Sequence, residues 1–260
     1  MHRIFPTLLL SCSLAFAQDP GANPPDAPKD KKPEIKQISE HEYQIGKISL
    51  DQKKREITFG AGINMTEGLL EYLIVGTQSN KVHEALFLTD ISALNLNIAL
   101  KLLGVGESPE LFEIVTEDYR PTGKFPEVPE EVRAKSRIDI LVEMGEGDKK
   151  KTISVNEMIH FIQWPEEGES GLKPGQEVTT DDLKLTTMKK GPWLSTGSYM
   201  HEGRFKAEVV QLMAAIYTAQ AALINYPGEG RLFGDVWIPN KTVVPEVGTK
   251  VKIIIKPYQP

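Results

Sequence analysis

Cysteine is nearly absent from this chain, since Cys12 is the only one among its 260 residues. Because Cys12 lies in an N-terminal segment that we expect to be removed, the mature chain is expected to contain none. Such a chain has no disulfide framework, no thiolate nucleophile, no cysteine-ligated zinc and no iron–sulfur cluster. Its stability must then come from its own core, which a chain of this length is large enough to bury.

Long apolar runs are absent as well. The first residues, MHRIFPTLLLSCSLAFAQDP, combine a basic start with a short apolar stretch that closes on AFA, the pattern read by a signal peptidase. We therefore predict a signal peptide over 1–17. The alternative is a lipoprotein signal that leaves Cys12 lipidated, although Leu10 is large for that motif. No later stretch approaches the ~20 apolar residues of a membrane span. The predicted location is secreted or periplasmic, or anchored through Cys12.

Positive charge is not in excess, because 30 Lys and Arg stand against 36 Asp and Glu, for a net charge of −6. Nucleic-acid binding requires a basic face that neutralises phosphates. The lysines here are scattered or gather at turns, as at 149–151, which we predict to be a hairpin tip. Nucleic acid is therefore not an expected partner.

The remaining chain divides into a leader and a domain. Residues 18–40 combine prolines and charge with few large apolar side chains, which predicts disorder. Residues 41–258 are predicted to form a single β-rich domain, because short alternating apolar runs are separated by turn residues. The expected fold is mainly β with minor α, its antiparallel sheets forming a sandwich or a barrel-like domain. Strands are expected at 43–51, 55–64, 67–75, 81–89, 137–144, 150–156 and 249–257.

Four parts of the chain carry further expectations. The runs at 67–75 and 81–89 are predicted to pair as a hairpin. One clear helix is expected at about 92–103, with Ser92 as its N-cap and Gly104 after its end. Residues 105–136 form a Pro- and Glu-rich excursion whose length is typical of functional loops. Pattern alone favours a long helix over 206–224.

Six separated pieces of the sequence together resemble the YdjY-like domain family of exported bacterial proteins. They are EGLLEYLIV, KVHEALFLTDISALNLNIALKLLG, RIDILVEM, PWLSTGS, YTAQAALIN and VPEVGTKVKIIIKP. The resemblance implies a mostly-β domain with one helix after the His-Glu strand, and a strand instead of a helix over 206–217. It carries no established reaction. Ferredoxin-like names of some relatives imply iron–sulfur binding, which this chain lacks the cysteines to provide. Relatives from mucus-dwelling bacteria suggest contact with glycoprotein such as mucin.

Four residues are candidates for hydrolytic catalysis: Glu71, Glu84, His83 and Asp90. In the predicted hairpin, Glu71 and Glu84 are diagonal neighbours on one apolar face, about 7–8 Å apart. Two carboxylates in such a setting suit general acid–base hydrolysis, because burial and like charge keep one of them protonated. The alternatives are a register shifted by one residue, which separates the two, or a face open to water. Asp90 precedes a helix start, where capping is the competing role.

Metal and aromatic sites carry weaker signals. Three His-Glu dipeptides, at 41–42, 83–84 and 201–202, lack the His-Glu-x-x-His spacing of a zinc peptidase, so no metal or other cofactor is expected. Trp193, Tyr199 and Trp237 are candidate glycan-stacking residues, with Trp164 and Tyr217 beside them. The competing role for such aromatic residues is filling the core.

Two functions follow from these observations. The preferred one is a secreted or periplasmic binding module of the YdjY-like type that contacts an extracellular glycoprotein or glycan. The alternative is a secreted carboxylate-dependent hydrolase, a peptidase or glycosidase, that degrades glycoprotein such as mucin.

Overall fold

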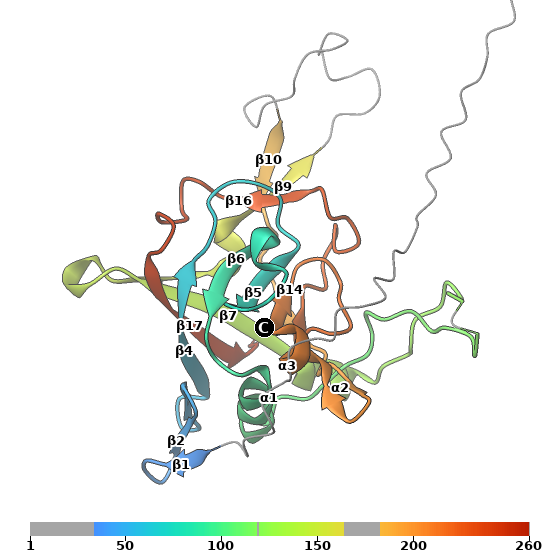
Figure 1. The fold of residues 1–260 in the computed structure, drawn as a ribbon, viewed down its shortest axis with the longest axis horizontal. Coiled ribbons are helices and arrows are strands. Elements are labelled where there is room, and N and C mark those ends of the chain that lie inside the picture. The colour runs from blue at the N-terminus through green and yellow to red at the C-terminus, as the bar shows by residue number, and fades with distance from the viewer. Residues whose placement is uncertain (1–33, 119, 164–182, 260) are drawn as a thin grey trace, which may run out of the picture. The chain divides into compact units, whose positions relative to one another are not determined.

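Strands dominate the computed structural model, which describes residues 34–118, 120–163 and 183–259 (Figure 1). They take up 37% of the described residues against 16% for helices, which confirms the mainly-β prediction. The described residues belong to one compact unit. The predicted signal peptide and most of the predicted leader lie outside the described residues.

An eight-stranded closed sheet forms the centre of this unit. Each strand pairs with its neighbours in a ring, and β6 pairs back onto β4 to close it. In ring order the strands are β4 (Glu56–Ile63), β17 (Lys250–Pro257), β7 (Arg137–Met144), β11 (Trp193–Ser195), β15 (Ile224–Asn225), β14 (Leu212–Ala215), β5 (Tyr72–Gly76) and β6 (Ala85–Thr89). The barrel alternative of the predicted fold is therefore the observed one.

Alternation of side chains explains the long strands of the barrel. In β4 and β7 every second residue is buried, and β17 follows the same alternation except that Ile254 is buried as well, because successive side chains point to opposite faces of a sheet. The inward set is rich in isoleucine, valine and phenylalanine and forms the main core cluster. The outward set of these three strands is largely polar and faces solvent.

Two strand pairs in the barrel are parallel, and one of them overturns the predicted hairpin. β5 and β6 run in the same direction, with Tyr72 opposite Ala85 and Ile74 opposite Phe87. β14 and β15 form the other parallel pair. Every residue of β5 is buried, and a continuous apolar run of this kind is typical of a parallel strand. The chain between β5 and β6 ends in the 3-10 helix η1 (Val82–Glu84), so Glu84 is not in a strand.

A side extension continues the sheet beyond β4. Its strands are β1 (Ile35–Gln37), β2 (Glu42–Ile45) and β3 (Ile48–Asp51), all antiparallel to their neighbours. β8 (Lys151–Ser154) pairs with β7 across the 3-10 helix η2 (Gly147–Lys149). The loop of this hairpin is 145–150, because Lys151 already pairs with Met144, so the predicted tip at 149–151 overlaps the loop but is placed too late in the chain. β1 lies within the predicted leader, so that leader prediction extends too far.

Two smaller sheets complete the strand inventory. β10 (Lys184–Thr187), β9 (Ile159–Gln163) and β16 (Trp237–Pro239) form one, at the top of the view in Figure 1. β12 (Met200–His201) and β13 (Arg204–Phe205) form a hairpin. The short 3-10 helix η3 (Val155–Met158) precedes β9.

The helix α1 (Ala93–Leu102) confirms the clearest local prediction. The Ser92 hydroxyl accepts a hydrogen bond from the amide of Asn95, and Gly104 follows the helix end with a φ of 81°, a conformation that favours glycine. α1 lies at the bottom of the view in Figure 1 and packs against β2 and β3. Among the described residues, no helix is long and apolar enough to cross a membrane.

The pattern predicted a helix over 206–224, and the resemblance predicted a strand over 206–217. The structure has a short helix followed by a strand. The segment begins as α3 (Lys206–Val210), reverses at Gln211, whose φ is 52°, and continues as β14. Ala214 and Ala215, two of the alanines in the predicted helix, lie in a fully buried strand instead. Tertiary burial thus overrides helix propensity here.

The 105–136 excursion is tied to the barrel at its start and ends in a helix. The amide of Ser108 donates to the carbonyl of Ser195 on β11 at 3.0 Å. Its last residues form α2 (Glu130–Ser136), where Arg133 pairs with Glu110 at 3.2 Å. Most of the segment between these two points is exposed to solvent.

Candidate functional site

Glu71 and Glu84 lie close together at one end of the barrel, through a strand pairing that differs from the predicted one. The predicted diagonal pairing required Glu84 in a strand antiparallel to β5, and that geometry is wrong. Parallel pairing places the start of β6 beside the start of β5 instead. The amide of Glu71 donates to the carbonyl of Glu84 at 3.0 Å. The backbone therefore brings the two glutamates together.

Tyr72 reports the local electrostatics of this pair. Burial raises the pKa of the Tyr72 hydroxyl, and the charge of Glu71, a hydrogen bond with Glu71 and the charge of Glu84 raise it further. A phenolate is disfavoured both in a desolvated position and next to carboxylates. Tyr72 therefore stays protonated as a hydrogen-bond donor well above its usual range.

The Glu84 carboxylate is only partly satisfied. Its Oε2 atom is shielded from solvent and accepts no hydrogen bond from the described residues. Lys81 Nζ lies 3.9 Å from this atom, and His83 Nε2 lies 3.4 Å from Oε1. His83 is itself exposed. The end of the barrel thus assembles three of the four predicted catalytic residues.

Asp90 lies apart from the other three. It follows β6, whereas Glu84 precedes it, so the length of the strand separates them by roughly 20 Å. A hydrogen bond from Lys47 lowers the pKa of Asp90, more strongly than burial raises it. Ser92 caps α1, and Glu208 also accepts from the amide of Leu94 at 2.9 Å. Asp90 therefore serves neither as the helix cap nor as a partner of Glu71 and Glu84.

The predicted stacking residues divide into core and surface. Trp193 and Trp237 are 0% and 2% exposed, and their indole N–H groups donate to Asn156 Oδ1 and to the Gly230 carbonyl at 3.0 and 3.1 Å. Neither ring offers a face to solvent. Tyr199 and Tyr217 are exposed, and Trp164 lies outside the described residues.

The three His-Glu dipeptides do not converge. His83 and His201 lie 3.4 and 3.9 Å from the glutamates of their own dipeptides, whereas His41 lies 3.9 Å from Glu40. Within residues 34–118, 120–163 and 183–259, no group of three or more His, Cys, Asp or Glu side chains is arranged to hold a metal ion.

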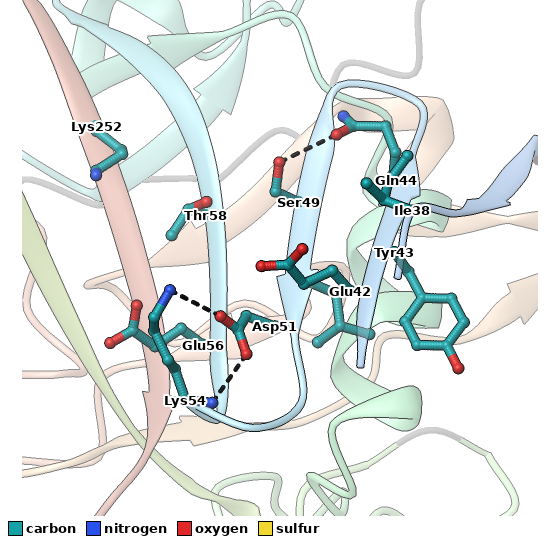
Figure 2. Close-up of a pocket in the computed structure, with 11 residues that line it drawn as sticks. Ile38, Glu42, Tyr43, Gln44, Ser49, Asp51, Lys54, Glu56, Thr58 and Lys252 are labelled. Carbon is teal, nitrogen blue, oxygen red and sulfur yellow. Dashed lines mark hydrogen bonds and ion pairs between the residues drawn. The ribbon is translucent and has the colours of Figure 1, made fainter. Parts of the chain in front are cut away.

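An open groove on the outer face of the sheet was not predicted from the sequence. Its volume is about 340 Å³, and Figure 2 shows its side chains projecting from β2, β3, β4 and β17. We call it the sheet groove. Its lining residues are Ile38, Glu42, Tyr43, Gln44, Ser49, Leu50, Asp51, Lys54, Glu56, Thr58 and Lys252.

Cross-strand register explains why polar groups gather in the sheet groove. Gln44 lies opposite Ser49, and Ser49 opposite Thr58, which gives one row of amide and hydroxyl groups. Glu42, Asp51 and Glu56 form a parallel row of carboxylates in the same way. The alternation along each strand marks these as outward positions, but only the pairing of distant strands aligns them.

Local interactions hold the groove side chains in place. Ser49 donates to the Gln44 side-chain oxygen at 3.1 Å (Figure 2). Lys54 pairs with Asp51 at 2.9 Å through Nζ, and its backbone amide also donates to that carboxylate. These two interactions lower the pKa of Asp51, the backbone one most strongly. The groove therefore presents carboxylates, an amide and hydroxyls to solvent, with Gln44, Ser49 and Asp51 held in place by these contacts.

Comparison with known proteins gives no matching family model, no matching curated protein and no matching solved structure. The resemblance to the YdjY-like family thus stays a prediction from the sequence.

Proposed function

We propose that this protein is an exported binding module of the YdjY-like type, which contacts an extracellular glycoprotein through glycan held in the sheet groove. The observation that carries the proposal is the row formed by Gln44, Ser49 and Thr58 beside the carboxylates of Glu42 and Asp51. It is an ordered set of hydrogen-bonding groups on an open surface.

The chemistry of these groups matches a polyhydroxylated ligand. Sugar hydroxyls both donate and accept hydrogen bonds, and carboxylate, amide and hydroxyl side chains together offer both complements. Hydrogen bonds to an ionised acceptor are the stronger ones. The carboxylate row is therefore expected to carry more of the affinity than the amide and hydroxyl row.

Binding of mucin-derived neutral oligosaccharides tests the proposal. Isothermal titration should detect binding to the purified protein and a clear loss of affinity in Glu42→Gln and Thr58→Val. Thr152→Val is the matched control, because Thr152 is an exposed threonine on β8 and lies outside the sheet groove. Absence of binding, or equal binding by Thr58→Val and Thr152→Val, contradicts the proposal.

A second candidate, a carboxylate-dependent hydrolase acting on glycoprotein, is favoured by one observation. Glu71 and Glu84 lie together beside Tyr72, and one oxygen of Glu84 is shielded without a hydrogen bond among the described residues. Incubation with mucin and casein across acidic to neutral pH, with and without chelator, tests for turnover. Activity should disappear in Glu84→Gln but persist in Glu67→Gln, whose carboxylate pairs with Lys241.

The location of the protein has its own test. N-terminal sequencing of the exported chain should begin at Gln18 if 1–17 is a cleaved signal peptide. Incorporation of labelled fatty acid that is lost in Cys12→Ala supports the lipoprotein alternative instead.

A further inference from the structure

A basic pocket lies next to the sheet groove. It has a volume of about 330 Å³ and is lined by Lys53, Lys54, Arg55, Asp139, Lys256, Pro257 and Gln259. Lys54 lines both this pocket and the sheet groove, so the two cavities adjoin. The pocket offers four cationic side chains against one carboxylate, in a chain whose net charge is −6.

The turn between β3 and β4 builds one side of the basic pocket. Its backbone is held where the amide of Lys54 donates to Asp51 at 2.9 Å. Arg55 then adopts a left-handed conformation, with a φ of 56°, which is uncommon for a residue other than glycine. Three consecutive basic side chains, at 53–55, are thereby concentrated in one tight turn.

The ends of two barrel strands build the other side. β17 places Lys256 directly opposite Asp139 of β7. Burial raises the pKa of Asp139, against the opposing effect of Lys256. A single carboxylate does not offset the four cationic side chains of the lining.

Two of the four cationic side chains are available to bind a ligand. Lys54 is paired with Asp51 at 2.9 Å, and Lys256 is paired with Glu56 at 2.6 Å. Lys53 and Arg55 form no ion pair with any residue that the structure describes, and both are exposed. An arginine fork with a lysine beside it suits an oxyanion, because guanidinium binds sulfate, phosphate or carboxylate oxygens through two hydrogen bonds.

We propose that the basic pocket binds an oxyanion carried by a glycan, a sulfate ester or a sugar carboxylate, through Lys53 and Arg55. Because Lys54 lines both cavities, a single acidic oligosaccharide reaches from the sheet groove into the basic pocket. The anion site stands on its own observations, whereas its connection to a glycan rests on the proposed function. Since the cations are exposed, we expect binding to weaken with added salt.

The double variant Lys53→Gln with Arg55→Asn tests the proposal, since asparagine tolerates the left-handed backbone of position 55. The matched control is Lys149→Gln with Lys151→Gln, which removes the same charge from the hairpin formed by β7 and β8. Thermal melts and circular dichroism establish that both variants fold. The probes are inorganic sulfate, and one mucin oligosaccharide preparation in native, desulfated, desialylated and doubly treated forms.

The expected result is that the double variant binds acidic oligosaccharide about tenfold more weakly at low salt. Its affinity for the doubly treated, neutral form should be unchanged, and the control should bind all forms as the wild type does. Comparison of the desulfated and desialylated forms identifies whether sulfate or carboxylate is the anion. The proposal is overturned if the double variant binds both inorganic sulfate and acidic oligosaccharide as tightly as the wild type does.

The two proposals fail separately. If neutral oligosaccharide binds and Thr58→Val abolishes it while inorganic sulfate does not bind, the basic pocket is overturned and the proposed function stands. If inorganic sulfate binds through Lys53 and Arg55 but no oligosaccharide binds, the anion site is supported and its connection to a glycan is overturned.

Discussion

The backbone amide of Glu71 donates to the carbonyl oxygen of Glu84 at 3.0 Å, so the entry to β5 is joined to the end of η1. This hydrogen bond holds two glutamates at one end of the barrel. Both of their charges act on the buried hydroxyl of Tyr72. The titration of Tyr72 is therefore a direct measure of how this end of the barrel is built.

Alkaline pH should destabilise the fold through Tyr72. Burial first, and then Glu71 and Glu84, raise its pKa above the ordinary value of 10.0. The stabilising contribution is complete below the unfolded-state pKa and is lost as pH rises from there through the folded-state pKa. Each pH unit within this window lowers the free energy of unfolding by about 1.4 kcal/mol.

Urea unfolding of the wild type and Tyr72→Phe between about pH 8 and pH 11 measures this contribution. The loss of stability with pH should be shallower in Tyr72→Phe. Identical slopes for the two proteins would contradict the assignment to Tyr72.

Removing either carboxylate should move the pKa of Tyr72 back toward its ordinary value. Glu71 acts through charge and a hydrogen bond, whereas Glu84 acts through charge alone, so Glu71→Gln should lower that pKa more than Glu84→Gln does. Absorbance titration of tyrosinate, with Tyr72→Phe as the reference, separates this residue from the others. Glu67→Gln is the control and should leave the Tyr72 titration where it is.

Asn156 is a polar residue in the core, and its hydrogen bonds should contribute to the stability of the fold. Its Oδ1 accepts from the buried Trp193 indole at 3.0 Å, and its Nδ2 donates to the Lys189 carbonyl at 2.7 Å. In Asn156→Leu both partners lose their hydrogen bond, and a buried unsatisfied group costs about 1–3 kcal/mol.

Urea unfolding followed by circular dichroism checks the effect of Asn156→Leu. The same substitution should cost less in a Trp193→Phe background, where no indole N–H remains to be satisfied. An equal cost in both backgrounds would show that the Trp193–Asn156 hydrogen bond contributes nothing.

Glu208 should stabilise the start of α1 from a neighbouring helix. Its carboxylate accepts from the Ser92 hydroxyl at 3.0 Å and from the Leu94 amide at 2.9 Å. Glu208→Gln and Ser92→Ala are each expected to destabilise by about 0.5–2 kcal/mol, the usual effect of losing an N-cap.

Because Ser92 and Glu208 share one network, the double variant should lose less stability than the sum of the two single losses. Denaturation of the wild type, both single variants and the double variant measures this coupling. Glu202→Gln, on the neighbouring hairpin, is the charge-matched control and should have little effect. Strict additivity of the Ser92 and Glu208 effects would contradict a shared cap.

Predictions from local spacing agreed with the structure. Ser92 and Gly104 bound α1, and the alternating apolar residues of β7 and β17 form strands within a residue of the expected bounds. Capping and alternation depend on residues that are close in the chain, so the sequence carries them directly. The helix pattern over 206–224 failed, because burial between β5 and β15 selected an extended conformation for β14.

The candidate sites depended on contacts that no local pattern encodes. The apolar runs before and after residues 76–80 are compatible with a hairpin and with a parallel pair. The two arrangements place Glu84 at different positions relative to Glu71. The sheet groove was missed for the same reason, because Ser49 and Thr58 meet only through pairing of β3 with β4. A row of outward polar residues cannot be recognised in the sequence until the register of its strands is known.

The sequence by itself determined that this chain folds around β-strands, where its clearest helix begins and ends, and which side of each long strand faces the core. The period of two and the capping residues are local properties and were sufficient for that. The tertiary structure alone decided that the sheet closes into a barrel, that β5 and β6 run parallel, and that four basic residues share one pocket. Those features arise from pairing between distant segments, where the free energy of burying the common core selects one arrangement among several that the same local patterns allow.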